Sequence, residues 1–535
     1  MRGILPVLLL AVLVFLPLLG SVHLFDWDEF NFAQAAREMS ERGDYLTVTI
    51  AGQPFYEKPP LFFWLQAMAS SLLGDSEASA RLPSAIASIM TALMLFLMGR
   101  RWKDEKQGLL WAGFYLGSFL PLVTGRMGLI DPVFNFWIAL GLFLLFELDR
   151  REERVFPLAM ISGLSLGLAV LSKGPLGAGI PIAIFVIYRL IKRDFHLRIL
   201  PFSLFLLALV LSAASWFLME SLVNGGDFIR EFVRYQVRLL QTQDAGHGGF
   251  PGYEFLIFLL GCFPLSVFAL RFLFRKESDP SLKDATLLAR VWLLFVLLLF
   301  ALVKTKIPHY TSLVYMPGAW LAAREVRLLA NSTRLSKLTL IFWVLVGGLI
   351  SLLLIALPAL MRNPDAWIHL IEDEFTRANI LRPVPWSPLA LIPGLLFALG
   401  TLVSLLWVFR GNWQRGTMSQ GFTVGLCVLL SWPFLLPKIE AHSQGGAIAL
   451  YESLREEPAD LCIAGFKSYA HLYTMGRRAW SDRSAEGRER LMTATDRPLY
   501  IVTPLHRTEE IQRQYPSRIL RREGGFVLLL REPLP

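Results

Sequence analysis

Long apolar runs recur along most of the chain and constrain its fold more than any other feature. A helix needs about 20 mostly apolar residues to cross a bilayer. Runs of this kind, a few of them shorter, lie at 4–22, 82–99, 107–125, 129–147, 156–172, 174–190, 199–219, 253–271, 288–303, 309–323, 338–358, 388–408 and 420–436. The sequence therefore predicts a polytopic α-helical membrane protein with about thirteen transmembrane helices.

The composition excludes the other broad classes. Hydrophobic residues make up 54% of the chain and charged residues only 18%, whereas soluble proteins carry about 25% charge. The net charge of +9 has a simple source in a membrane protein, because basic residues gather in cytoplasmic loops. It therefore does not indicate nucleic-acid binding. The three cysteines, Cys262, Cys427 and Cys462, form no CxxC pair and predict no disulfide framework.

The distribution of Lys and Arg predicts the orientation. Short basic loops at 100–106, 148–154, 188–198, 271–290, 324–337 and 409–416 lie on one side of the predicted spans. These loops should be cytoplasmic. The longer loops 23–81, 220–252 and 359–387 then lie outside, and so does the C-terminus. The apolar stretch 4–22 is predicted to be a retained first helix rather than a cleaved signal peptide.

The first outer loop, 23–81, has the pattern of a structured segment. Asp26 or Asp28 could cap a helix that ends at Gly43. A second, aromatic helix should start after Pro59-Pro60. Amphipathic helices of this kind lie along a membrane surface, so they are predicted to cover a cavity on the outer face.

The composition becomes polar near residue 441. Short strands are predicted at 461–466, 499–503 and 525–530, with helices at 449–457 and 484–493. The expected organisation is a transmembrane domain over residues 1–440 and a small α/β domain outside the membrane over residues 441–535.

Ionisable residues gather at the predicted outer ends of the spans. Such groups are costly at membrane depth and are functional candidates by default. The set comprises Asp28, Glu29, Glu57, Lys58, Arg126, Asp131, Lys173, His247, Lys304, Lys306, His309 and Tyr310. Purely structural roles remain open for some of them. Asp28-Glu29 could cap a helix, and the lysines could extend to the membrane surface. Carboxylates beside ammonium groups suit an anionic substrate and a nucleophile that must lose a proton.

Five motifs in order carry a family resemblance. They are Asp28-Glu29 to Arg81-Leu82-Pro83, Leu129-Ile130-Asp131-Pro132, Ser172-Lys173-Gly174-Pro175, Asp244–Gly249, and Lys304-x-Lys306-Ile307-Pro308-x-Tyr310. Over roughly residues 1–325 the chain resembles bacterial dolichyl-phosphate-mannose-protein-mannosyltransferase-like enzymes. Among these it is most similar to the lipid A aminoarabinose transferases. The resemblance implies a GT-C fold in the bacterial inner membrane, with juxtamembrane helices over a cavity that faces the periplasm.

The resemblance also implies a reaction and its participants. The donor would be a sugar on polyprenyl phosphate, and the acceptor lipid A or another envelope glycolipid. Transfer would proceed with inversion. Asp28 is then the expected base and Asp131 a second acid or positioning group. The donor phosphate would be bound by Lys58, Lys173, Lys304, Lys306 and Tyr310, with Glu29, Tyr56, Arg126 and His309 positioning the substrates.

A divalent, zinc-like metal ion is a candidate cofactor. Glu57 offers a carboxylate and His247 an imidazole, both of which are zinc ligands. Two ligands do not make a complete site. Such an ion would tie two outer loops together rather than take part in the chemistry.

The chain departs from the aminoarabinose transferases at two places. It has Asn31 where those enzymes tend to carry Arg, and Phe250-Pro251-Gly252-Tyr253 replaces their aromatic run. Both positions could contact substrates. Protein O-mannosylation therefore remains an alternative activity. A lipid or sugar transporter is a weaker alternative, because transporters often show internal repeats and none is visible here.

Overall fold

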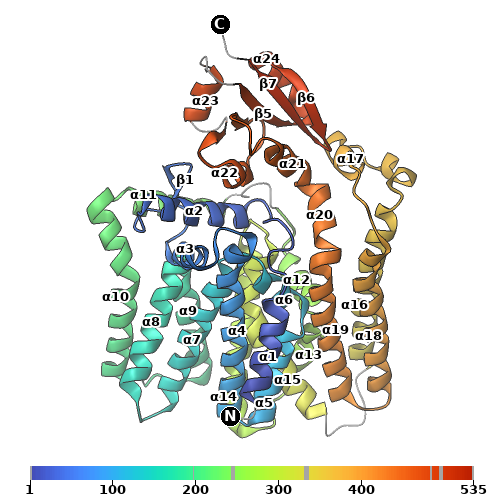
Figure 1. Ribbon diagram of the computed structural model, residues 1–535. Coiled ribbons are helices and arrows are strands. Elements are labelled where there is room, and N and C mark those ends of the chain that lie inside the picture. Colours follow the sequence, from blue (N-terminus) through green and yellow to red (C-terminus); the bar gives the residue numbers. More distant parts are fainter. Residues whose placement is uncertain are drawn as a thin grey trace.

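The protein folds into a bundle of long helices with a small sheet domain at one end. The computed structural model describes residues 3–196, 198–241, 248–329, 337–481, 485–492 and 498–532. The N-terminus lies at the end of the bundle opposite the sheet domain (Figure 1). The helices of the bundle are α1 (Ile4–Phe15), α4 (Glu77–Trp102), α5 (Glu105–Leu116), α6 (Phe119–Arg126), α7 (Asp131–Arg150), α8 (Val155–Lys173), α9 (Leu176–Lys192), α10 (Ile199–Asn224), α12 (Tyr253–Gly261), α13 (Leu265–Leu273), α14 (Lys283–Leu302), α15 (Tyr315–Leu329), α16 (Lys337–Met361), α18 (Ile392–Phe409) and α19 (Trp413–Phe434).

The helical membrane fold is confirmed, whereas the number of spans stays a prediction. Among the described residues, seven helices are long and apolar enough to cross a membrane, or up to nine if each of two bent pairs forms one span. The bent pairs are α5 with α6, and α19 with α20 (Leu436–Ser443). Each predicted stretch contains a helix, but the one at 309–323 begins later. There the chain first forms a 3-10 helix, η3 (Pro308–Val314), and α15 follows it.

Close helix approaches lock parts of this bundle together. A Cβ added at Gly108 of α5 would lie 2.3 Å from the Phe96 carbonyl oxygen of α4. A Cβ at Gly163 of α8 would lie 2.2 Å from the Phe205 carbonyl oxygen of α10. Small residues that bring backbones together are typical of helix packing in membranes. These glycines therefore fix the spacing of two helix pairs.

A layer of shorter elements covers the end of the bundle nearest the sheet domain (Figure 1). It contains α2 (Asp28–Arg42), β1 (Thr49–Ile50), β2 (Gln53–Pro54), α3 (Leu61–Leu73) and α11 (Asp227–Gln241). The two helices predicted in the first outer loop are α2 and α3, and α2 ends at Gly43 with φ 65°, as the sequence predicts.

The predicted cap of α2 is wrong. The residue before the helix is Trp27, and no side chain caps the first turn. The Asp26 side chain instead accepts a hydrogen bond from the Trp27 N–H, with a distance of 2.8 Å. Asp28 is the first helical residue, so its carboxylate is available for other contacts.

The C-terminal domain is a five-stranded sheet with helices. Its strands are β3 (Asp460–Ile463), β4 (Ala479–Ser481), β5 (Leu499–Pro504), β6 (Arg518–Glu523) and β7 (Phe526–Arg531), in the order β4-β3-β5-β7-β6. β3 pairs parallel to β4 and β5, and β7 pairs antiparallel to β5 and β6. The helices are α21 (Gly445–Ser453), α22 (Ala470–Met475), α23 (Ala485–Met492) and α24 (Thr508–Gln514), and α17 (Glu374–Ile380) comes earlier in the chain.

The sequence predicts three of these five strands. Strand β6 was missed because it lies at the sheet edge and consists mostly of exposed, charged residues, so it lacks the apolar alternation of a half-buried strand. Strand β4 is only three residues long.

Candidate active site

Two carboxylates from distant parts of the chain face one histidine. Asp28 opens α2, Asp131 opens α7, and His309 lies in η3. His309 Nε2 lies 3.5 Å from Asp28 Oδ2 and 3.9 Å from Asp131 Oδ2. The Asp28 side chain is 38% exposed, whereas that of Asp131 is 6% exposed. Asp28 is therefore the carboxylate that a substrate can reach.

A lysine neutralises the buried carboxylate. Lys173, the last residue of α8, places its Nζ 2.7 Å from Asp131 Oδ1. The same ammonium group lies 4.9 Å from the ring centre of Tyr310. The tight turn after α8 brings this lysine to the cluster, because Gly174 has φ 106°. Only glycine adopts such a backbone without strain.

A second lysine enters from the first outer loop. Lys58 lies 5.0 Å from the ring centre of Tyr235 on α11. Burial lowers the pKa of Lys58, and the negative charges of Glu57 and Asp28 oppose that shift. Lys58, Lys173, Asp28, Asp131, His309 and Tyr310 are called the outer cluster below.

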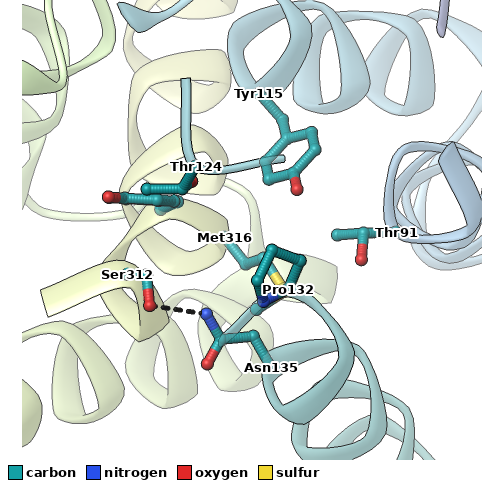
Figure 2. A pocket seen from close by; sticks show the side chains of 8 residues that line it. Thr91, Tyr115, Thr124, Pro132, Asn135, Ser312 and Met316 are labelled. Atoms are coloured by element: carbon teal, nitrogen blue, oxygen red, sulfur yellow. Dashed lines mark hydrogen bonds between the residues drawn. The ribbon is translucent and has the colours of Figure 1, made fainter. Parts of the chain in front are cut away.

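A hydrogen bond below the outer cluster joins two of its supports. Asn135 Nδ2, one turn after Asp131 on α7, donates to Ser312 Oγ at 2.8 Å. Ser312 follows His309 in η3. The pair lines a small polar cavity together with residues such as Tyr115 and Thr124 (Figure 2). This bond ties α7 to η3 and so holds Asp131 and His309 in register.

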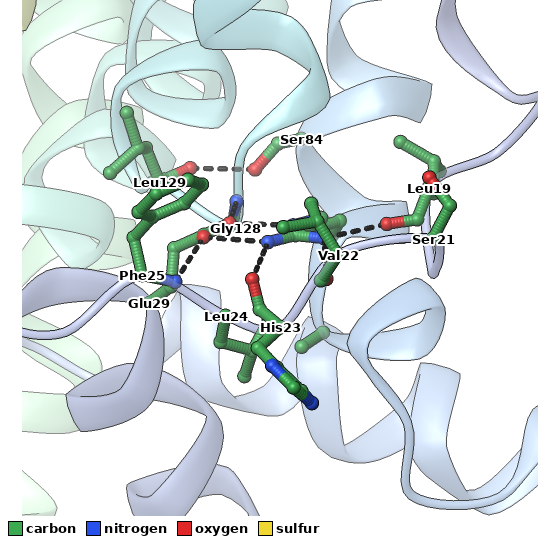
Figure 3. Close-up of polar contacts among 12 residues, drawn as sticks. Leu19, Ser21, Val22, His23, Leu24, Phe25, Glu29, Ser84, Gly128 and Leu129 are labelled. Atoms are coloured by element: carbon green, nitrogen blue, oxygen red, sulfur yellow. Dashed lines mark hydrogen bonds and ion pairs between the residues drawn. The ribbon is translucent and has the colours of Figure 1, made fainter. Parts of the chain in front are cut away.

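A buried ion pair supports the first turn of α2. Glu29 Oε1 and Oε2 accept hydrogen bonds of 2.8 and 2.9 Å from the Arg81 guanidinium of α4. The Glu29 carboxylate also accepts from the N–H groups of Phe25 and Gly128 (Figure 3). Arg81 donates further to the carbonyl oxygens of Leu19, Val22 and His23. Glu29 is only 1% exposed, so it anchors α2 rather than contacting a substrate.

Two further predicted phosphate-binding lysines, Lys304 and Lys306, have different surroundings. Lys306 Nζ donates to the Phe300 and Ala301 carbonyl oxygens at the end of α14 and lies 3.9 Å from Glu254. A phosphate that bound Lys306 would have to displace these contacts. The Lys304 side chain, in contrast, is exposed.

Arg126 and Tyr56 hold elements together. Buried Arg126 donates to the carbonyl oxygens of Val14 and Pro17 at the end of α1, each at 2.6 Å. Tyr56 packs against Phe228 of α11, with ring centres 5.8 Å apart. Both residues shape the scaffold around the outer cluster.

The predicted metal pair, Glu57 with His247, stays a prediction. His247 lies outside the described residues, although Glu57 lies within them. No group of three or more His, Cys, Asp or Glu side chains suited to a metal ion occurs among the described residues.

Sequence reasoning missed Asn135 and Ser312, and it named Arg81 within a family motif without giving it a role. Arg81 carried a signal, because an arginine inside the first turns of an apolar helix is costly unless paired. Asn135 and Ser312 are neutral residues within apolar surroundings and carried none.

Comparison with known proteins agrees with this architecture. The family model described as dolichyl-phosphate-mannose-protein mannosyltransferase matches residues 57–217. The crystal structure of ArnT from Cupriavidus metallidurans bound to undecaprenyl phosphate superposes with a TM-score of 0.79, covering 98% of this chain and 97% of that one, at 18% identity. The apo structure gives a TM-score of 0.77. The fold is therefore the GT-C fold of a multi-pass membrane protein.

Relatives place the chain more narrowly. The undecaprenyl phosphate-α-4-amino-4-deoxy-L-arabinose arabinosyl transferase of Pectobacterium atrosepticum is 27% identical over 84% of this chain and 79% of its own length. The corresponding protein of Pseudomonas aeruginosa is 30% identical over 55% of this chain and 54% of its own. These similarities confirm the resemblance predicted from the sequence, to GT-C glycosyltransferases close to the aminoarabinose transferases.

Proposed function

We propose that the protein transfers a sugar from a polyprenyl-phosphate donor to an acceptor on the outer face of the membrane, with lipid A or a similar envelope glycolipid as the acceptor. The outer cluster is the observation that carries this proposal, since it combines an accessible carboxylate with two ammonium groups. The relatives named for undecaprenyl-phosphate-linked aminoarabinose support the same donor chemistry.

The outer cluster suits direct displacement. Asp28 takes the proton of the acceptor hydroxyl or phosphate, and the acceptor oxygen attacks the anomeric carbon of the sugar. The bond between that carbon and the phosphate oxygen breaks, and polyprenyl phosphate leaves with the electron pair. Lys58 and Lys173 stabilise the negative charge of the leaving phosphate. A single displacement inverts the anomeric centre.

The donor sugar is tested directly. Purified protein in lipid vesicles receives undecaprenyl phosphate carrying 4-amino-4-deoxy-L-arabinose or mannose, with lipid A as the acceptor. Transfer of aminoarabinose to lipid A supports the proposal. Transfer of mannose to a Ser/Thr-rich peptide would favour the activity that gives the matching family model its description. Absence of transfer from both donors would contradict the proposal.

The expected orientation places the outer cluster in the periplasm of the bacterial inner membrane. Gly226→Cys, in an open position before α11, and Arg410→Cys, in an exposed position after α18, provide two labelling sites. In intact spheroplasts a membrane-impermeant maleimide should label residue 226 alone, and lysis should expose residue 410. The three native cysteines are buried, so the parent protein is the blank. Labelling of residue 410 before lysis would overturn the orientation.

Lys58→Ala should weaken binding of undecaprenyl phosphate. Loss of one charge-assisted hydrogen bond costs about 1.5–3 kcal/mol, which corresponds to about 10- to 100-fold in Kd. The affinity is measured by microscale thermophoresis in detergent. Lys283→Ala, an exposed lysine at the start of α14, is the matched control and should bind normally. Equal affinities in both variants would remove Lys58 from the phosphate site.

A further inference from the structure

The backbone just before Asp28 is strained. Trp27 has φ 82° and ψ −107°, a conformation that a residue with a bulky side chain rarely adopts. Such strain persists only where the surroundings enforce it, and it clusters at functional sites. Contacts from two parts of the chain surround Trp27 and its neighbours.

The C-terminal domain supplies one of these contacts. Lys467, which follows β3, places its ammonium group 4.4 Å from the centre of the Trp27 ring. This distance is within the range of a cation–π interaction. An exposed lysine is ordinarily solvated, but here it lies on the residue that precedes Asp28.

Further contacts hold the same backbone from both sides. Gln444, between α20 and α21, accepts a hydrogen bond from the Asp26 N–H at 2.6 Å and donates to the Leu24 carbonyl oxygen at 2.7 Å. The Asp26 carboxylate accepts hydrogen bonds from Ser468 and from the Tyr469 backbone, while burial raises its pKa. The C-terminal part of the chain thus holds residues 24–27 in place through these hydrogen bonds.

The same domain also holds α2 further along. Arg37 donates to the Tyr473 carbonyl oxygen at 2.5 Å and lies 3.9 Å from the Tyr473 ring centre. Phe30 packs edge-on against that ring, with centres 5.6 Å apart. The position of Asp28 is therefore fixed by the Glu29–Arg81 pair on the membrane side and by the C-terminal domain on the other.

We infer that Lys467 and Gln444 are positioning residues for sugar transfer: the C-terminal domain holds Trp27 in its strained conformation and thereby aims Asp28 at the acceptor. This inference rests on the proposed function, in which Asp28 is the base. On this inference the C-terminal domain contributes to turnover by positioning Asp28, without supplying a reacting group itself.

The test compares kinetic constants of full-length variants in vesicles. Lys467→Ala and Gln444→Ala should each lower kcat about 10- to 100-fold, since small displacements of a catalytic group cost that much. KM for the donor and the acceptor should stay within about twofold of the parent. Lys467→Arg keeps a cation over the ring and should restore most of the turnover. Arg513→Ala, an exposed position of the same domain, is the control for general damage and should have normal kcat.

A double variant separates this inference from the proposed function. If Lys467 acts through Asp28, then Lys467→Ala should cause no further loss in an Asp28→Asn background. The inference would be overturned by a normal kcat in both single variants, or by a Lys467→Arg variant whose kcat is as low as that of Lys467→Ala. It would also be overturned if the losses in kcat were fully additive in the double variant. An active Asp28→Asn protein would instead overturn the assignment of the base.

Discussion

Asp28→Asn should reduce turnover by about 10²–10⁴-fold, the usual contribution of general base catalysis. Asn keeps the size of the side chain, and Asp28 caps no helix that the change could damage, because α2 starts without a side-chain cap. The variant should therefore fold normally and bind undecaprenyl phosphate like the parent. Turnover is measured with the donor that the parent protein uses.

Asp131→Asn is the necessary companion. Asp131 is paired with Lys173 at 2.7 Å, so its loss should free that ammonium group and alter donor affinity as well as turnover. Asp28→Asn should alter turnover alone. If Asp131→Asn lost turnover while Asp28→Asn kept it, the base would be Asp131. Full activity in both variants would contradict the proposed mechanism.

Glu29→Gln should strongly destabilise the protein. It leaves the Arg81 guanidinium, which is fully buried, without a counter-charge. Breaking a buried ion pair by removing one partner costs about 3–5 kcal/mol. The midpoint of thermal unfolding in detergent should fall by several degrees, and α2 should become more accessible to protease near Arg42.

The exposed ion pair of Arg42 with Asp44 provides the matched control. Its two side chains are 35% and 34% exposed, and pairs of this kind contribute about 0–1 kcal/mol. Asp44→Asn should therefore leave the midpoint almost unchanged. Equal midpoints in the Glu29→Gln variant and the parent would show that the Glu29–Arg81 pair does not anchor α2.

The sequence predicts the fold well because its signals are local. Apolar runs mark the bundle helices, and Gly43 marks the end of α2. The same local reasoning fails at the start of α2, where a strained Trp27 replaces the expected Asp cap. Strain depends on contacts with residues more than 400 positions away, such as Gln444, and sequence spacing does not reveal them.

The sequence predicts which residues form the candidate site, but it does not predict which of them contact one another. Asp28, Asp131, Lys173 and His309 lie at element ends on one side, and the structure brings them together. Lys306 has the same sequence signal, yet its ammonium group binds carbonyl oxygens at the end of α14. A charged side chain near the end of a predicted span marks a residue as a candidate, whereas only the fold decides what that side chain contacts.

The glycine contacts within the bundle have a consequence for how substrates enter. Where Gly108 lies against α4 and Gly163 against α10, the backbones are too close for a methyl group, so these helix pairs are ill suited to sliding or parting. In the proposed reaction, two lipid substrates must nevertheless reach Asp28. Any opening that admits them must therefore occur elsewhere than between α4 and α5 or between α8 and α10.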